Sequence, residues 1–499
     1  MKYYITTPIY YVNDSPHIGS VYTTLAADII ARFKRLDGFD VHFLTGTDEH
    51  GQKVEKAANA KGFAPKKFCD TVCERFKNVC SEINISNDDF IRTSEDRHKI
   101  VVQEVWQKLL NQGNIYLGKY CGWYSIRDEA FYNENELDAE GLAPTGSVVE
   151  WIEEPSYFFD LSKWQDRLLE FYDANPDFIL PHYRANEVKS FVKSGLEDLS
   201  VSRTSFQWGI KVPNDESHVI YVWLDALFNY YSAVKTQSLQ GFWPPDLHIV
   251  GKDITRFHAV YWPAFLMALD LPLPKRVFAH GWWLVEGAKM SKSTGNVIDP
   301  FKLKEEFGLD YLRYYLMREM PFGNDHSYSR ESFINKINSE LCNNIGNLCQ
   351  RVLVFVQKNA DSTVPSGDNF TDEDNQILQT SYQAIDKMRA HIDKQMIHLA
   401  FEEVVKLSSI TNDYISKNAP WDLKKNNPHR LGSVLYTLLE IIRNIGILVS
   451  PLLPNASEKI LDSLAIDKDS RTFKFVCKEH KMVAGIKLPT PQMIFPRIG

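Results

Sequence analysis

Cysteine is scarce in this sequence, with seven residues among 499 and no two of them in a C-x-x-C pair. An odd number of thiols in a long chain argues against a disulfide framework and for a reducing, cytoplasmic compartment. A charged N-terminal segment followed by an apolar run is also absent, so no cleavable signal is predicted. The most apolar stretch, Val434 to Leu453, contains Glu440 and Arg443 and is broken at Pro451. It therefore indicates a buried helix, and we expect no attachment to a membrane.

An excess of basic residues is missing as well, because the net charge is −8. Any contact with nucleic acid must therefore be local, on a basic face of an acidic protein. The sequence shows no internal repeat and no low-complexity segment. Its 44% hydrophobic and 24% charged residues are typical of a globular protein, and its length predicts two to four domains.

The N-terminal segment has the pattern of a strand, a helix and a second strand. Residues Tyr3–Thr6 are rich in β-forming side chains and lead into a polar turn, in which Ser15 is the expected N-cap and Pro16 opens the helix. Apolar residues then recur at helical spacing, and Gly38 ends the helix: Val21, Leu25, Ile29, Phe33 and Leu36. Val41 to Leu44 form the next strand. This order predicts a doubly wound parallel sheet of the α/β class, a Rossmann-like nucleotide-binding fold.

Two short motifs suit the binding of phosphate groups. His17 and Gly19 fall at the predicted start of the first helix, where free N–H groups and the helix dipole favour anions. The second motif, Lys289-Met-Ser-Lys292-Ser, lies between glycines 287 and 295 and predicts a mobile cationic loop. Either motif alone is more often a helix cap or a solvated surface loop, so the prediction depends on their joint presence.

Together the two motifs resemble the HIGH and KMSKS signatures of class I aminoacyl-tRNA synthetases, although Ser20 stands where the family has a second histidine. The runs 221–230 (YVWLDALFNY) and 251–262 (GKDITRFHAVYW) resemble the methionyl-tRNA synthetase family in particular. By this resemblance, the residues implied in catalysis are His17, Gly19, Lys289 and Lys292. Those implied in ATP binding are His17, Gly19, Ser20, Gly251, Asp253, Lys289, Ser291 and Lys292.

The resemblance also implies a methionine pocket that is aromatic and largely uncharged. Its implied members are Ile9, Tyr11, Asp48, Trp223, Ala226, Tyr230, Ile254, His258 and Trp262. Asp48 is the expected partner of the substrate ammonium group, and Arg203 is expected to orient Asp48. A polarizable thioether gains about 0.3–1.5 kcal/mol against an aromatic ring, and Tyr11 and His258 are expected to reach the sulfur. Without the flanking motifs, these aromatic residues would be predicted as ordinary core.

The family organisation predicts five segments. They are two halves of the catalytic fold (1–114 and 203–280), a connective-peptide insertion (115–202), a KMSKS and stem-contact region (281–340) and an all-α anticodon-binding bundle (341–499). Many relatives bind zinc in the insertion through paired cysteines, but Cys121 is the only cysteine here, so we expect neither structural zinc nor any other metal ligand set. The residues implied in reading the anticodon are Asn347, Arg351, Pro420 and Trp421. Lys424, Lys425 and Arg430 add positive charge suited to phosphates. No appended C-terminal domain follows, so a monomer is expected.

The implied reaction has two steps: methionine and ATP form methionyl-adenylate and pyrophosphate, and the acyl group then passes to tRNA(Met), including initiator tRNA, with release of AMP. Mg²⁺ is expected to accompany ATP without a dedicated carboxylate site. Three alternatives stay open at this point. The first is a class I synthetase for another apolar amino acid, against which the short insertion argues. The second is a small-molecule nucleotidyltransferase, which would not need residues 340–499. The third is a non-catalytic tRNA-binding paralogue, which only Ser20 favours.

Overall fold

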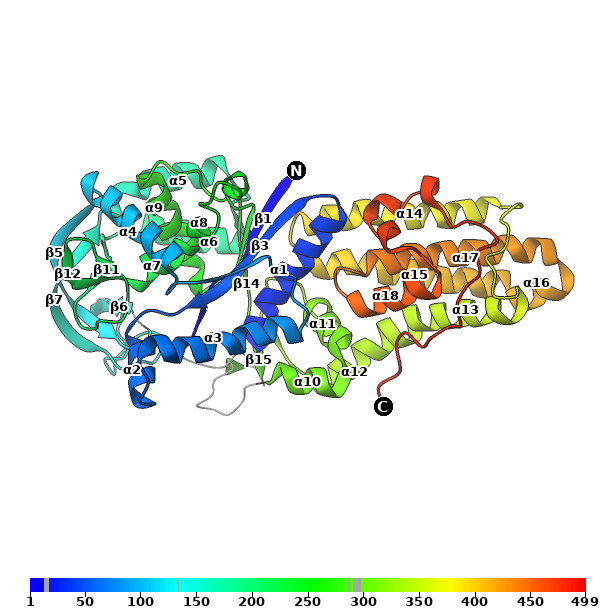
Figure 1. Cartoon of the computed structure of the whole chain (residues 1–499), viewed down its shortest axis with the longest axis horizontal. Coiled ribbons are helices and arrows are strands. Elements are labelled where there is room, and N and C mark those ends of the chain that lie inside the picture. The colour runs from blue at the N-terminus through cyan, green and yellow to red at the C-terminus, as the bar shows by residue number, and fades with distance from the viewer. Residues whose placement is uncertain (13–17, 129, 133, 286–287, 290–297) are drawn as a thin grey trace. The chain divides into compact units, whose positions relative to one another are not determined.

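A computed structural model describes the chain except for residues 13–17, 129, 133, 286–287 and 290–297 (Figure 1). The predicted cap and first turn of the first helix, Ser15 and Pro16, lie outside the described residues. The chain divides into two compact units, each discontinuous in sequence. One unit consists of residues 1, 17–40 and 281–499, and the other of residues 2–16 and 41–280.

The second of these units is built on a parallel sheet of seven strands in the order β2-β3-β1-β13-β14-β8, with β4 paired to β3. The strands are β1 (Lys2–Thr6), β2 (Tyr10–Tyr11), β3 (Asp40–Asp48), β4 (Asp89–Arg92), β8 (Ile179–Leu180), β13 (Leu247–Gly251) and β14 (Val277–His280). The pairings of β1 with β13, β13 with β14, β14 with β8, β2 with β3 and β3 with β4 are all parallel. The central strands are nearly continuous runs of buried residues, as expected of a sheet covered on both faces. The predicted doubly wound α/β fold is confirmed.

Helices and two smaller antiparallel sheets complete this unit. The helices are α2 (Gln52–Ala60), α3 (Pro65–Glu82), α4 (Asp96–Asn111), α5 (Gln165–Ala174), α6 (His182–Lys193), α7 (Val222–Leu227), α8 (Asn229–Ser232), α9 (Trp262–Ala268) and the π-helix η5 (Phe257–Tyr261). One sheet, in the order β6-β5-β7-β9, contains β5 (Ile115–Ser125), β6 (Ala130–Tyr132), β7 (Glu150–Phe159) and β9 (Leu199–Ser200). The other, in the order β10-β12-β11, contains β10 (Ser202–Arg203), β11 (Lys211–Val212) and β12 (Asp215–Ile220).

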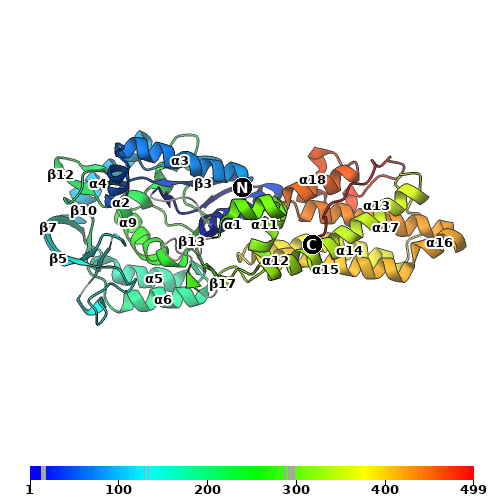
Figure 2. The ribbon, with the colours of Figure 1, turned by 90° about the horizontal axis from the view of Figure 1, so that it is seen from below.

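The other unit is mainly helical (Figure 2). Its helices are α1 (Ile18–Leu36), α10 (Pro300–Phe307), α11 (Leu309–Arg318), α12 (Arg330–Lys336), the π-helix η7 (Ile337–Gly346), α13 (Asn347–Asn359), α14 (Asp372–Ile392), α15 (Ile397–Asn418), α16 (Pro420–Asn426), α17 (Pro428–Leu448) and α18 (Pro454–Ser463). A small sheet joins β15 (Trp283–Val285) to β16 (Ala288–Lys289) and β17 (His326–Ser327). Helices α13, α14 and α15 pack against α17, which forms the centre of the bundle.

Helix α17 is the one described helix that is long and apolar enough to cross a membrane, yet 94% of its most apolar window is buried inside the protein. The prediction of a buried helix in this stretch is confirmed. Its charged members are paired: Arg443 Nε donates to Glu440 Oε2 at 2.9 Å, and both side chains are almost fully buried. Pairing of this kind is what allows a helix core to contain charge.

A buried arginine connects the first helix of the chain to its C-terminal third. Arg313 of α11 donates to Asp28 Oδ2 of α1 at 2.7 Å and to the carbonyls of Leu452 and Pro451 at 2.8 and 3.0 Å. Asp28 also accepts from Arg32 Nε at 2.8 Å. The carboxylate and the Arg313 guanidinium are 0% and 1% exposed. Helix α1 is therefore an integral part of the helical unit although it lies between two strands of the sheet in sequence.

Candidate active site

Polar side chains gather where the parallel strands end. Asp48, the last residue of β3, is 3% exposed and is the Cα partner of Tyr11 in β2. Gly251 ends β13, and a Cβ placed there would lie 2.6 Å from Asp253 Oδ1 in the short helix η4 (Lys252–Ile254). A larger residue here would therefore force this carboxylate to shift. In open parallel sheets, ligands bind outside the carboxyl ends of the strands, which is where these residues lie.

Two aromatic rings stack beside this edge of the sheet. Trp223 of α7 lies over Phe257 of η5, with ring centroids 3.5 Å apart and an interplanar angle of 9°. Trp223 is only partly buried, whereas its neighbours in α7 are buried. Phe257 opens a π-helical turn, a local irregularity that often occurs at functional sites.

Tyr230 and His258 form a buried hydrogen-bonded pair. The His258 Nδ1–H donates to the Ile254 carbonyl at 3.0 Å, so Nε2 accepts from the Tyr230 hydroxyl at 2.7 Å. Burial lowers the pKa of His258 to about 4, so the imidazole is neutral near pH 7. Both ring nitrogens are thus engaged within the protein. A direct polar contact of His258 with the methionine sulfur, as the sequence led us to expect, would require the Tyr230 hydroxyl to turn away.

A second buried histidine, His248 of β13, lies behind this pair. Trp262 Nε1–H donates to His248 Nε2 at 3.3 Å, and His248 Nδ1–H faces Thr6 Oγ1 at 2.6 Å. Burial again lowers the pKa of His248, well below its usual value. The Tyr230 ring lies 4.3 Å from His248 and 6.0 Å from Trp262 between ring centroids. The cluster is therefore aromatic, polarizable and uncharged.

The remaining predicted pocket residues belong to the same unit. Ile9 and Ile254 are partly buried against its main core, and Ala226 is buried in α7. Arg203 is 2% exposed, donates to Ser200 Oγ at 2.7 Å and to the Ser202 carbonyl at 2.6 Å, and lies 4.2 Å from the Tyr221 ring centroid. The orientation of Asp48 by Arg203 stays a prediction.

The two nucleotide signatures fall in the other compact unit. Gly19 and Ser20 occupy the first turn of α1, and Lys289 ends the short strand β16. His17, Ser291 and Lys292 lie outside the described residues, so their predicted roles are untested by the geometry. The motif that contains Gly19 was predicted to lie at the start of a helix. This is consistent with α1, whose first described residue is Ile18.

The C-terminal bundle brings together the residues predicted to read an anticodon. Asn347 and Arg351 lie one turn apart in α13, and Pro420 and Trp421 begin α16 after Ala419 in the left-handed region (φ 41°). The Arg351 guanidinium carbon lies 5.9 Å from the Trp421 ring centroid, and Trp421 is 45% exposed. Trp421 is therefore not a fully packed corner residue. The guanidinium and the indole form an accessible surface of the kind on which RNA bases stack.

Arg430 has a different environment from the neighbouring lysines. Its guanidinium forms an ion pair with the buried carboxylate of Asp374 in α14, with Nη2 to Oδ1 at 2.7 Å, and donates to Asn418 Oδ1 at 2.9 Å. Lys424 and Lys425 are exposed. The positive charge of Arg430 is thus used inside the bundle, which corrects the expectation that it is suited to contact phosphates.

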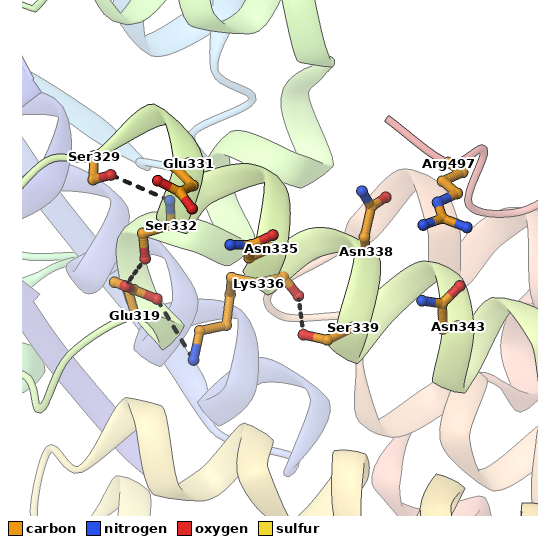
Figure 3. A pocket seen from close by; sticks show the side chains of 10 residues that line it. All are labelled: Glu319, Ser329, Glu331, Ser332, Asn335, Lys336, Asn338, Ser339, Asn343 and Arg497. Atoms are coloured by element: carbon orange, nitrogen blue, oxygen red, sulfur yellow. Dashed lines mark hydrogen bonds and ion pairs between the residues drawn. The ribbon is translucent and has the colours of Figure 1, made fainter. Parts of the chain in front are cut away.

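A polar hollow of about 730 Å³ runs along α12 and η7 (Figure 3). Small hydroxyl and amide side chains follow one face of these helices, Ser332, Asn335, Asn338, Ser339 and Asn343, and Arg497 faces them. Figure 3 shows Lys336 reaching Glu319, with Nζ to Oε2 at 3.5 Å, and Ser332 donating to the same carboxylate. None of the described residues that line the hollow has an apolar side chain.

Among the described residues, no group of three or more histidine, cysteine, aspartate or glutamate side chains could hold a metal ion. Cys121 lies in β5, and the absence of zinc stays a prediction. Phe257, His248 and the buried cluster of His50, His98 and Asp225 were not predicted from the sequence. A signal existed for Phe257, which is adjacent to His258 in the motif 251–262, whereas the others pair with residues far away in sequence.

Family models and individual relatives give the same result along the chain. The family described as tRNA synthetases class I (M) matches residues 3–148 and 141–353, and the anticodon binding domain of methionyl tRNA ligase matches residues 364–499. The chain is 57% identical to a methionine–tRNA ligase of Rickettsia felis, covering 99% of the chain and 98% of the relative, and 51% identical to that of Brucella suis, covering 99% and 98%.

Solved structures are also similar. Mycobacterium tuberculosis methionyl-tRNA synthetase in complex with methionyl-adenylate has a TM-score of 0.96 and 46% identity, covering 99% of this chain and 100% of that one. The apo form of that enzyme gives a TM-score of 0.91 and 43% identity, covering 100% and 98%.

Proposed function

Because the chain belongs to the methionyl-tRNA synthetases of class I and is a methionine–tRNA ligase, we propose that the aromatic cluster beside Asp48 is its methionine site. The alternatives of a different class I synthetase, a small-molecule nucleotidyltransferase and a non-catalytic paralogue find no support in these relatives. The observation that carries the proposal is the partly buried Trp223 stacked on Phe257, next to a neutral Tyr230–His258 pair. Neutral rings suit a thioether side chain, and a carboxylate at the strand end suits an ammonium group.

In the first step, a carboxylate oxygen of methionine attacks the α-phosphorus of ATP, and the bond to the bridging oxygen breaks to release pyrophosphate. This step needs no protein nucleophile, so we assign the chain two tasks, positioning and stabilisation of negative charge. We propose that Asp48, aided by Arg203, holds the ammonium group and that Ile9, Tyr11, Trp223, Ala226, Tyr230, Ile254, His258 and Trp262 hold the side chain. We propose that ATP is held by His17, Gly19, Ser20, Gly251, Asp253, Lys289, Ser291 and Lys292.

In the second step, the 2′-hydroxyl of the terminal adenosine of tRNA attacks the adenylate carbonyl, and AMP leaves. We propose that Trp421 and Arg351 stack on an anticodon base, with Asn347 and Pro420 beside them, and that the polar hollow along α12 and η7 contacts a tRNA stem. Double-stranded RNA is recognised largely through phosphates and 2′-hydroxyls, which hydroxyl and amide side chains can meet. The absence of apolar lining residues in Figure 3 supports an RNA partner over a protein partner.

We propose that the enzyme acts as a cytoplasmic monomer on tRNA(Met), including initiator tRNA, and that Mg²⁺ accompanies ATP without a protein ligand set. Sedimentation of the enzyme alone tests the oligomeric state.

The test of the methionine site is ATP–pyrophosphate exchange in two variants. Asp48→Asn should raise the methionine KM, because a neutral amide cannot pair with the ammonium group. Lys292→Ala should leave the methionine KM nearly unchanged and lower the exchange rate about a hundredfold, the loss typical of one donor to developing charge. An unchanged methionine KM in Asp48→Asn would refute the site assignment.

A further inference from the structure

A fully buried carboxylate lies between two imidazoles in the unit that holds the proposed methionine site. Asp225 Oδ2 accepts from His50 Nδ1–H at 2.6 Å, and Asp225 Oδ1 accepts from His98 Nε2–H at 2.6 Å. The carboxylate and both rings are at most 3% exposed. None of these three residues belongs to the predicted pocket, so the cluster has no role in the function as proposed so far.

The polar groups of the cluster satisfy one another. The Ser232 hydroxyl donates to the Phe228 carbonyl at 2.8 Å and lies 3.0 Å from His98 Nδ1. Each oxygen of the Asp225 carboxylate thus accepts from one imidazole, and the second nitrogen of His98 has Ser232 as its partner. Burial raises the pKa of Asp225, but the two imidazoles lower it by more, so that it lies below its usual value. The carboxylate is therefore fully hydrogen-bonded, which is the form in which a buried charge is tolerated.

The cluster connects the two parts of the proposed methionine site. His50 follows Asp48 by two residues, in the turn after β3. Asp225 follows Trp223 by two residues and precedes Ala226 in α7. A single carboxylate therefore joins the segment proposed to hold the ammonium group to the helix proposed to hold the side chain.

The turn is fixed on its other side as well. Glu49 lies between Asp48 and His50, and its carboxylate accepts from Arg92 Nε at 2.6 Å and Nη2 at 3.0 Å. Its backbone N–H donates to Thr93 Oγ1 at 2.9 Å. These contacts hold the turn to β4 and the residues after it, whereas the bond between His50 and Asp225 joins it to α7. Loss of this bond would loosen the turn from the helix without unfolding the sheet.

We propose that Asp225, acting through His50 and His98, is a positioning residue that sets the distance between the ammonium-binding carboxylate and the side-chain-binding ring of the methionine site. This inference rests on the proposed function of Asp48 and Trp223. Because Asp225 acts on both contacts to methionine and on none to ATP, its loss weakens methionine binding selectively.

The first variant is Asp225→Asn, measured by ATP–pyrophosphate exchange with each substrate varied in turn. The neutral amide keeps the shape of the carboxylate but presents one N–H to an imidazole N–H. We expect the methionine KM to rise about tenfold, the ATP KM to change by less than about twofold, and most of kcat to be kept. A rise of equal size in both KM values, or an unchanged methionine KM, would overturn the proposal.

A pair of variants at His50 covers the case in which Asp225→Asn does not fold. An asparagine amide can place an N–H close to the position of the histidine Nδ1, whereas alanine cannot. We therefore expect His50→Ala to raise the methionine KM and His50→Asn to restore much of the wild-type value. Equal methionine KM values in the two variants would contradict a role that acts through this hydrogen bond.

The matched control is Asp246→Asn in the same unit. Asp246 accepts from the backbone N–H of Tyr4 at 2.7 Å and from Lys275 Nζ at 2.6 Å, and these contacts do not involve the turn or α7. This variant should lower the melting temperature while leaving the methionine KM unchanged. A selective rise of the methionine KM in Asp246→Asn would show that any loss of stability produces the effect, and would overturn the proposal.

Asp48→Asn distinguishes a failure of this inference from a failure of the proposed methionine site. If Asp48→Asn raises the methionine KM and Asp225→Asn does not, the inference fails and the proposed site stands. If Asp48→Asn has no effect, the proposed site fails and the inference fails with it.

Discussion

His258 keeps the part of the proposed methionine site that would hold the side chain uncharged. Its imidazole is fully buried and gives one hydrogen bond to a carbonyl and receives one from Tyr230. Since burial holds its pKa at about 4, the ring takes up a proton in the unfolded chain at a higher pH than in the folded one. The unfolded state is therefore favoured as pH falls below about 6.5, the ordinary pKa of histidine.

This shift predicts a pH-dependent stability. The stabilising contribution of the neutral ring is complete above pH 6.5 and is lost as pH falls to about 4, a loss of about 3 kcal/mol over this window. We expect the free energy of unfolding of His258→Asn to fall less steeply between these pH values than that of the wild type. His182→Asn, whose side chain is 69% exposed, should keep the wild-type slope. Parallel pH profiles for the wild type and His258→Asn would contradict the prediction.

The role proposed for Trp421 allows RNA recognition and catalysis to be tested separately. Stacking of an RNA base on an aromatic ring is worth about 1–3 kcal/mol, so Trp421→Ala should lower tRNA charging about ten- to a hundredfold. Exchange of pyrophosphate needs no tRNA and should hardly change. Because the indole is 45% exposed, the melting temperature should change little.

The control for Trp421→Ala is Phe63→Ala, which removes an aromatic side chain of similar exposure, 44%, from the other unit. Charging should be unaffected in this control. Parallel loss of exchange and charging in Trp421→Ala, or unchanged charging, would refute the assigned role.

At the scale of elements, the start of α14 depends on a network around Asp374. Thr371 and Asp374 form a reciprocal capping box, Tyr414 donates to the Asp374 carboxylate, and Arg430 forms an ion pair with it. The carboxylate is fully buried, whereas the guanidinium is 15% exposed. Removal of Arg430 would leave a buried charge with only neutral partners, which is costly.

We therefore predict that Arg430→Ala lowers the free energy of unfolding by about 3 kcal/mol, the lower end of the range for a broken buried ion pair. Lys425→Ala removes a nearby exposed cation and should leave the unfolding free energy almost unchanged. Urea denaturation of both variants measures the difference. If Arg430→Ala were as stable as the wild type and instead weakened tRNA binding in a salt-dependent way, a phosphate contact would be the correct role.

Helices and strands that have their own pattern of apolar residues or a glycine at their end were predictable from the sequence. The predicted strand Tyr3–Thr6 and helical stripe correspond to β1 and α1, and Gly38 adopts a φ of 86° just after the helix. The predicted strand 41–44 is the core of a longer strand, β3, because the polar residues that follow it also pair in the sheet. The π-helices η5 and η7 were not predicted, because one extra residue per turn hardly changes the apolar spacing of a helix.

The site was predictable only in part, for a related reason. The family motifs contain Trp223, Tyr230 and His258, but the partner of a buried polar residue is set by tertiary structure. Asp225 and His98 are 127 residues apart, and Asp28 and Arg313 are 285 apart. By hydropathy alone, each charged residue would be placed at the surface. No sequence pattern here shows which charged residues are instead buried and paired with each other.

At the scale of the whole chain, the bond between Asp28 and Arg313 holds the N-terminal helix to the C-terminal third. Asp28→Asn would remove the negative charge that balances a fully buried guanidinium, at a cost of about 3–5 kcal/mol. We predict a large fall in melting temperature for this variant. Asp37→Asn breaks a comparable pair with Arg389, whose side chain is 39% exposed, and should cost about 1 kcal/mol or less. Equal melting temperatures for the two variants would contradict this ranking.

The same bond limits how the gene could be divided. The polypeptide passes between the two compact units at residues 1–2, 16–17, 40–41 and 280–281, so the RNA-binding portion is not a cassette that begins where the last catalytic strand ends. A fragment starting at residue 281 would carry the Arg313 guanidinium without the helix that neutralises it. A fusion protein that is to contain this portion would therefore also need residues 17–40, two dozen residues from the opposite end of the reading frame. The same holds for inheritance of this portion as a separate module.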